Sequence, residues 1–248
     1  MRVLATYNIK GGVGKTSAAV NLAYLAAQEG RRTLLWDLDP QGAATFLFRV
    51  RPRVRGGVKA LIRGRTSLDA LIKGTDFDNL DLLPADFSYR TMDLALDRAK
   101  RPTRRIAQLL KPLAAEYQVL ILDCPPSVSL VSEGVLRAAD TLLVPLVPAT
   151  LSLRTFDQLT DFVAHARRPR PRILAFFSMV DSRKRLHRDT VARVGAERSD
   201  LARAIVPAAS IVEQMGPRRL PVVVFSPKSA AAAAYRQLWT EVRDLAER

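Results

Sequence analysis

The sequence predicts an α/β protein with a doubly wound, mostly parallel sheet flanked by helices, and three observations predict it. Short apolar runs recur along the chain, helix-like stretches separate them, and polar motifs follow the runs directly. Continuous apolar runs are typical of strands buried on both faces of a parallel sheet. A repeated strand-helix-strand order is typical of doubly wound sheets, whose ligands bind beyond the carboxyl ends of the strands. The 248 residues suit a single domain, 1–248.

Individual elements follow from the apolar and polar pattern. The predicted strands are residues 3–7, 33–36, 119–122, 141–144 and 173–177. The predicted helices are residues 16–28, 151–167 and 229–246, the first closed by Gly30. Two basic segments interrupt this alternation, a loop at residues 49–65 and a cluster at residues 167–172.

A glycine-rich loop follows the first predicted strand and opens the first helix. Gly14-Lys15-Thr16 matches the end of the standard phosphate-binding loop, although Ile9 stands where that pattern has its first glycine. Backbone N–H groups of such a loop and of the next helix bind phosphate. Lys15 is predicted to reach the β- and γ-phosphates, and the Thr16 hydroxyl to bind Mg²⁺. The predicted phosphate-site residues are Gly11, Gly12, Val13, Gly14, Lys15, Thr16 and Ser17.

The sequence Lys10-Gly11-Gly12-Val13-Gly14-Lys15-Thr16 resembles the deviant phosphate loop of the ParA/MinD family of ATPases, and the resemblance extends over essentially the whole chain. It is greatest to small ParA-type ATPases without an N-terminal helix-turn-helix domain. Lys10 matches the signature lysine of the family. The resemblance implies ATP and Mg²⁺ as cofactors. It also implies an ATP-dependent homodimer in which Lys10 reaches the phosphates of the other subunit.

Two further motifs carry the resemblance. Asp37-Leu38-Asp39-Pro40-Gln41-Gly42 matches the first switch of the family, which implies that Asp39 positions the attacking water and the metal shell. Asp123 ends an apolar strand and is followed by Cys-Pro-Pro, the arrangement that holds Mg²⁺ through its water shell. The implied metal residues are Thr16, Asp39 and Asp123. The implied catalytic residues are Lys10, Lys15 and Asp39, with slow, partner-stimulated ATP hydrolysis.

The residues expected to contact the nucleotide base match the family pattern less completely than the phosphate loop does. In ParA relatives a proline at position 207 and an asparagine two residues later lie against adenine. Pro207 is present here, but Ala209 replaces the asparagine, so no side-chain amide contacts the base. Base recognition is then expected to depend on backbone groups near Ser178, Met179, Pro207 and Ala209.

The charge balance predicts a polyanionic partner. There are 39 Lys and Arg residues against 24 Asp and Glu, a net charge of +15. The electrostatic field of this positive charge attracts nucleic acid or an anionic membrane. The alternative, without functional meaning, is a genome-wide preference for arginine. The resemblance to ParA favours nonspecific DNA. The candidate DNA contacts are Arg51, Arg53, Arg55, Arg167, Arg168, Arg170, Arg183, Lys184, Arg185, Arg218 and Arg219.

Three functional classes remain open. A ParA-type ATPase would position a plasmid, a chromosome origin or a protein assembly such as a carboxysome, with a ParB-like or other adaptor that stimulates hydrolysis. A MinD-like membrane regulator is disfavoured because residues 244–248 lack an amphipathic tail. A small-molecule ATP-dependent enzyme would not be expected to keep Lys10. The single cysteine, Cys124, excludes a cluster carrier, and the expected location is the cytoplasm, on the nucleoid.

Overall fold

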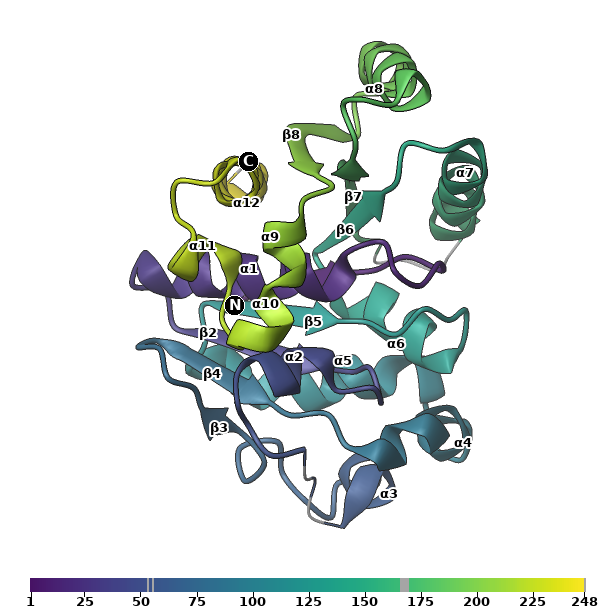
Figure 1. Ribbon diagram of the computed structural model, residues 1–248. Coiled ribbons are helices and arrows are strands. Elements are labelled where there is room, and N and C mark those ends of the chain that lie inside the picture. Colours follow the sequence, from purple (N-terminus) through teal and green to yellow (C-terminus); the bar gives the residue numbers. More distant parts are fainter. Residues whose placement is uncertain (53, 55, 166–169, 248) are drawn as a thin grey trace.

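A single twisted sheet forms the centre of the molecule in the computed structural model, which describes residues 1–52, 54, 56–165 and 170–247 (Figure 1). The spatial order of its strands is β3-β4-β2-β5-β1-β6-β7-β8. The strands are β1 (Arg2–Thr6), β2 (Thr33–Asp37), β3 (Lys73–Gly74), β4 (Leu80–Leu83), β5 (Val119–Asp123), β6 (Thr141–Leu146), β7 (Arg172–Val180) and β8 (Leu201–Pro207). All described pairings are parallel except that between β3 and β4.

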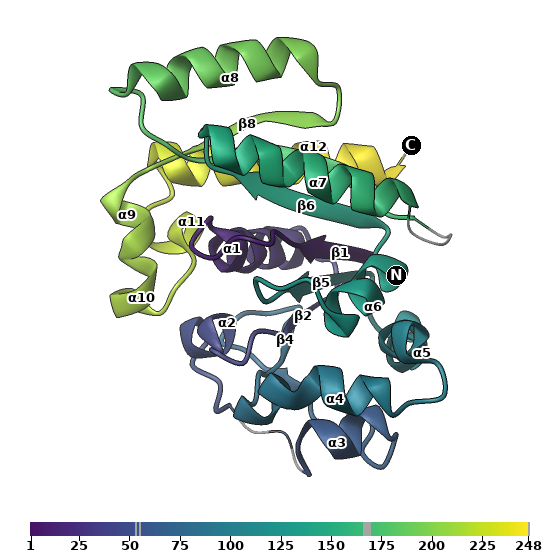
Figure 2. The same ribbon diagram turned by 90° about the vertical axis from the view of Figure 1, so that its right-hand side faces the viewer.

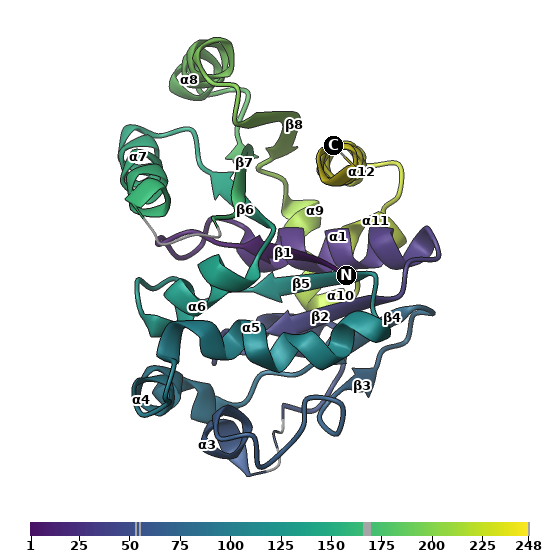
Figure 3. The ribbon, with the colours of Figure 1, turned by 180° about the vertical axis from the view of Figure 1, so that it is seen from behind.

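The helices lie on both faces of this sheet (Figure 2). The α-helices are α1 (Lys15–Gln28), α2 (Ala43–Leu47), α3 (Gly57–Ile62), α4 (Met92–Asp97), α5 (Arg105–Leu110), α6 (Leu130–Ala138), α7 (Thr150–His165), α8 (Arg185–Glu197), α9 (Ser210–Glu213), α10 (Met215–Arg218), α11 (Val222–Phe225) and α12 (Ala230–Glu247). The 3₁₀ turns are η1 (Phe87–Thr91), η2 (Pro102–Arg104) and η3 (Lys111–Ala115). The end of the molecule that carries α3 and α4 is opposite the end that carries α8 (Figure 3).

Two hydrophobic cores result from the alternation of side chains along the central strands. In β5, Leu120 and Leu122 belong to the core beneath α3 to α7, whereas Val119 and Ile121 belong to the core beneath α1 and α12. Every residue of β5 is buried. Burial on both faces explains why these strands are continuous apolar runs in the sequence. It also explains why Asp37 and Asp123 appear only where β2 and β5 end.

The predicted fold class is confirmed, and each of the five predicted strands and three predicted helices corresponds to an element of the structure. Strands β3, β4 and β8 were not predicted. In β8, residues facing α12 are buried while Arg203 and Ile205 are exposed, so the strand lacks the continuous apolar run that marked the others. The interpretation of residues 49–65 as a loop was wrong, because α3 lies within it. Val58, Leu61 and Ile62 form a buried helical stripe there, and the surrounding arginines obscured it.

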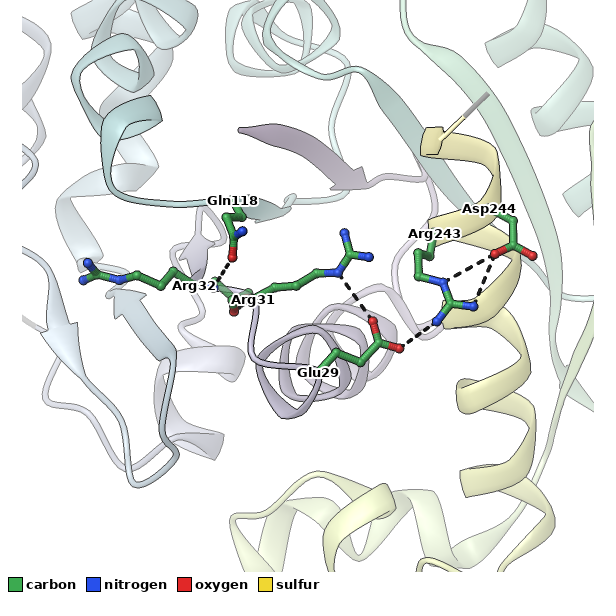
Figure 4. A network of polar contacts seen from close by, with 7 residues as sticks. Glu29, Arg31, Arg32, Gln118, Arg243 and Asp244 are labelled. Carbon is green, nitrogen blue, oxygen red and sulfur yellow. Dashed lines mark hydrogen bonds and ion pairs between the residues drawn. The ribbon is translucent and has the colours of Figure 1, made fainter.

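A surface network joins the end of α1 to α12 (Figure 4). The Glu29 carboxylate lies 3.4 Å from Arg31 Nε and 3.1 Å from Arg243 Nη1, and Arg243 also contacts Asp244. Nearby, the Arg32 backbone N–H donates to the Gln118 side chain. These pairs are partly exposed and contribute little stability individually, so the apolar contacts between α1 and α12 dominate their packing. Among the described helices, none has the length and apolar character needed to cross a membrane.

A candidate nucleotide-binding and hydrolysis site

The glycine-rich loop lies between β1 and the start of α1, as the sequence predicts. Gly14 is the N-cap of α1 and has φ of 94°, a left-handed conformation that glycine adopts without steric cost. A Cβ atom at this position would lie 2.8 Å from Ser178 Oγ, so the neighbouring β7 also requires glycine. The free backbone N–H groups at the start of this 14-residue helix provide an anion-binding site.

Lys15 is held in place beside that site. Its side chain is buried, and Nζ donates to the Lys10 carbonyl at 2.9 Å. Burial lowers the pKa of Lys15, whereas the negative charges of Asp123 and Asp39 act in the opposite direction. The Asn8 side chain connects the same loop to β6. Its Nδ2 donates to the Pro145 carbonyl, and its Oδ1 accepts from the Lys10 N–H. The loop is therefore fixed at both β1 and β6 before a ligand binds.

The segment after β2 is braced by a buried carboxylate. Asp37 Oδ2 accepts from the backbone N–H and the hydroxyl of Thr45, at 2.8 and 2.7 Å. The Thr45 hydroxyl in turn accepts from the Ala85 N–H at 2.8 Å. Burial raises the pKa of Asp37 to about 6, and the bonds from Thr45 oppose that rise. Asp39, two residues farther on, is only partly buried, and its Oδ1 accepts from the Gln41 N–H.

We expect Thr45→Val to destabilise the protein by about 2 kcal/mol, because it leaves the buried Ala85 N–H without an acceptor and removes one of the two donors to Asp37 Oδ2. Thr45→Ser keeps the hydroxyl and is the control, with a cost of about 1 kcal/mol for the lost methyl group. Urea unfolding followed by circular dichroism measures both variants. Equal stabilities for valine and serine would show that the hydroxyl does not hold this segment.

Asp123 lies at the end of β5 and is fully buried. Its Oδ1 accepts from the Thr6 hydroxyl, whereas Oδ2 has no hydrogen-bond partner among the described residues. Burial first, and then the charge of Asp37, raise the pKa of Asp123 to about 8. A buried carboxylate oxygen without a donor is a suitable partner for a water ligand of Mg²⁺. The oxygen-rich set of Thr16, Asp39 and Asp123 fits this hard cation.

The loop opens into a pocket of about 490 Å³, which is large enough for a nucleotide. Its lining includes Gly11, Gly12, Gly14, Lys15, Thr16, Ser17, Asp39, Met179, Pro207 and Ala209 from the prediction. Val13 does not line it, because its side chain is buried beneath the loop. Lys10 and Asp123 lie outside the described lining. The pairing of Val180 with Pro207 between β7 and β8 brings the predicted base-contacting segments together.

Comparisons with known proteins agree with this geometry. Residues 1–174 match the family model described as an AAA domain. The chromosome partitioning protein ParA of Myxococcus xanthus is 32% identical over 247 residues, which cover 97% of this chain and 87% of the relative. The chain belongs to the ParA/MinD family of ATPases.

Solved structures show the same fold. Cobyrinic acid a,c-diamide synthase from Mycobacterium smegmatis, with bound ATP analogue and magnesium, is 27% identical with a TM-score of 0.79, covering 97% of this chain and 93% of that one. The cell division ATPase MinD of Pyrococcus furiosus is 21% identical with a TM-score of 0.80, covering 98% and 99%. The fold is therefore shared by relatives with different functions, and function must be argued from the site.

Sequence reasoning missed several residues of this ParA/MinD site. Asn8 and Thr45 fix the two loops, and Ser210, Val212, Glu213 and Tyr235 line the pocket. Asn8 had a weak signal, because a polar residue directly after an apolar strand is typical of a loop support. Tyr235 of α12 had none, since only the packing of distant segments brings it to the pocket, whereas the residues of α9 directly follow the predicted base segment at Pro207 and Ala209.

The predicted DNA contacts are scattered over the structure, and several have local partners. Arg183 forms a two-pronged pair with Asp181, and Arg185 lies 3.4 Å from Asp189. Arg219 donates to the Phe46 carbonyl, and the Arg218 guanidinium lies over the Phe225 ring. Of the remaining candidates, Arg51, Arg170 and Lys184 are exposed. Arg53, Arg55, Arg167 and Arg168 lie outside the described residues.

Proposed function

We propose that this ParA/MinD-family protein is an ATP-dependent dimerising ATPase that binds DNA nonspecifically and positions a cargo. The single observation that carries the proposal is the pocket in which the deviant phosphate loop, Lys15 and Asp39 meet. The bound ATP analogue and magnesium in the M. smegmatis structure support ATP and Mg²⁺ as cofactors here. The likeness to a chromosome partitioning protein supports partition or positioning as the role.

Each residue of the site has a distinct proposed task. The N–H groups of the loop bind the phosphates and Lys15 neutralises their charge. Thr16, Asp39 and Asp123 would hold Mg²⁺, which supplies further neutralisation of phosphate charge when bound. Asp39 orients the attacking water, and Lys10 reaches the phosphates of the partner subunit. The hydrolysis rate depends on how well the attacking water and the phosphates are positioned, and not on covalent chemistry by the protein. Hydrolysis is slow in the protein alone because an adaptor protein completes that positioning.

DNA binding follows the nucleotide state in this proposal. Dimerisation doubles the number of arginines that face one duplex, so a modest monomer affinity becomes a high dimer affinity. Hydrolysis separates the subunits and releases the DNA. The protein would thus occupy the nucleoid in its ATP state and leave it where a ParB-like or other adaptor stimulates hydrolysis. Chromosome origin, plasmid and protein assembly all remain candidate cargoes, and the M. xanthus relative favours the first.

A small-molecule synthase is the second candidate, favoured by the M. smegmatis likeness. The two candidates differ in what stimulates ATP hydrolysis. A positioning ATPase hydrolyses ATP faster with DNA and adaptor, whereas a synthase requires its acceptor molecule. Hydrolysis assays with and without duplex DNA therefore distinguish them.

We expect the ATP-bound protein to bind duplexes of any sequence and the ADP-bound protein to bind them weakly. If each subunit neutralises about three phosphates, log K falls with log[salt] at a slope of about −5 for the dimer and about half that for a monomer. Fluorescence anisotropy over a salt series, with ATP, ADP or no nucleotide, measures these slopes. Equal affinity and equal slope in all three states would contradict nucleotide-controlled DNA binding.

A further inference from the structure

A second basic surface lies at the end of the molecule that carries α3 and α4, and it combines part of the basic segment at residues 49–65 with residues 98–105, which the sequence did not single out. Two adjoining hollows, of about 90 and about 500 Å³, share Arg63, Ala95 and Arg98 in their walls. We call these hollows together the basic groove. Its cationic residues are Lys59, Arg63, Arg98, Lys100, Arg101 and Arg105.

The fold assembles this groove from separate pieces of chain. Lys59 and Arg63 come from α3 and its end, Arg98 from the end of α4, and Arg105 from the start of α5. Arg105 Nε donates to the Ile62 carbonyl at 2.6 Å, which ties α5 to the end of α3. Its guanidinium lies against Gly64, where an added Cβ would be 3.0 Å from Nη2. Arg105 thus fixes one wall of the groove, and the other cationic residues line the rest of it.

Opposing charge is absent from the described lining of the groove, because none of those residues is acidic. The two aspartates of α4 lie elsewhere. Asp93 accepts from the Val131 N–H of α6, and Asp97 is exposed outside the described lining. Arg63, Arg98, Lys100 and Arg101 are all exposed. Cations gathered without carboxylates repel one another, and a polyanion relieves that repulsion.

We propose that the basic groove is the principal contact of this protein with the phosphodiester backbone of DNA. The inference rests on the proposed function and adds the surface that performs it. Guanidinium groups bind phosphate oxygens in pairs, which suits the four arginines of the groove. No described residue of the lining is aromatic, so the groove offers no surface for base stacking. Backbone contacts alone give binding without sequence preference.

The local pairs described above favour this groove over the sequence-predicted arginines at and just before the start of α8. Arg183 is neutralised by Asp181 through two side-chain hydrogen bonds, and Arg185 by Asp189. A paired arginine must lose its carboxylate partner before it binds phosphate, and it adds less net charge to the surface. In the part of the chain that the structure describes, no carboxylate pairs with the groove cations, so they require no such exchange.

The test compares two charge reversals of equal size, Arg98→Glu with Arg101→Glu in the groove and Arg183→Glu with Arg185→Glu as the matched control. We expect the groove variant to bind a 24-base-pair duplex at least about tenfold more weakly in ATP, with its salt slope reduced from about −5 to about −2. The control should stay within about threefold of the wild type. Neutral Arg98→Gln with Arg101→Gln should lie between, and ATP hydrolysis without DNA should be unchanged in all of them.

Three results would overturn the inference. The first is a groove variant that binds DNA as the wild type does in ATP, which would leave the proposed function intact. The second is an equal loss in the α8 control, which would mean that net charge rather than the groove determines affinity. The third is displacement of DNA by a twelve-residue polyglutamate peptide at equal charge concentration, which would indicate an acidic protein partner. A wild-type protein that binds no DNA in any nucleotide state would instead defeat the proposed function itself.

Discussion

Lys15→Ala lowers nucleotide affinity by about 100-fold or more, whereas Lys10→Ala leaves it within about twofold of the wild type and abolishes dimerisation. The reason is geometric. Lys15 lies in the pocket wall with its Nζ beside the phosphate loop, while the Lys10 side chain is partly exposed and lies outside the described lining. Loss of a buried charge opposite a phosphate costs several kcal/mol. Titration with fluorescent ATP measures affinity, and light scattering measures dimerisation.

Lys73→Ala is the matched control for both lysines, since it removes one exposed ammonium group from β3 at the sheet edge. It should bind nucleotide and dimerise as the wild type does. A Lys10→Ala variant that dimerises normally in ATP would show that this lysine does not act across the interface. Retained nucleotide binding in Lys15→Ala would contradict the proposed phosphate site.

Asp39→Ala slows single-turnover ATP hydrolysis by about 100-fold or more, while nucleotide affinity changes little. A carboxylate that orients the attacking water acts mainly in the transition state, so its removal affects the hydrolysis rate far more than ground-state binding. The ATP-bound dimer then accumulates and remains on DNA. Rapid-quench measurement of product and anisotropy of labelled DNA follow the two effects together.

Asp39→Asn separates the water-orienting role from a structural one. The amide oxygen can still accept the Gln41 N–H, which holds the loop after β2 in its present shape. Asparagine lacks the negative charge that attracts a proton of the attacking water. We therefore expect Asp39→Asn to hydrolyse ATP as slowly as Asp39→Ala. A wild-type rate in Asp39→Asn would assign the residue to loop shape alone.

How far the sequence predicted the site depended on whether a contact is local along the chain. The glycine-rich loop was predictable because the conformation of Gly14 and the helix start at Lys15 are determined by adjacent residues. Asp123 was predictable because a carboxylate ends a run that is otherwise entirely apolar. The doubly wound sheet followed from the same runs, since burial on both faces leaves no room for polar residues. Strand β8 was not predicted because only one of its faces is buried, so buried and exposed residues alternate along it.

Tertiary structure alone decided which distant residues meet. Thr45 holds Asp37 and Ala85 together only because α2 packs against the end of β2, and Tyr235 joins the pocket only because α12 packs against β8. The groove cations come from two separate segments of the chain, residues 49–65 and 98–105. They form one groove because α3, α4 and α5 meet there. Sequence thus determined the composition and local geometry of the phosphate site. Packing determined the supports of its loops and the grouping of the surface cations, because long-range contacts have no local sequence signature.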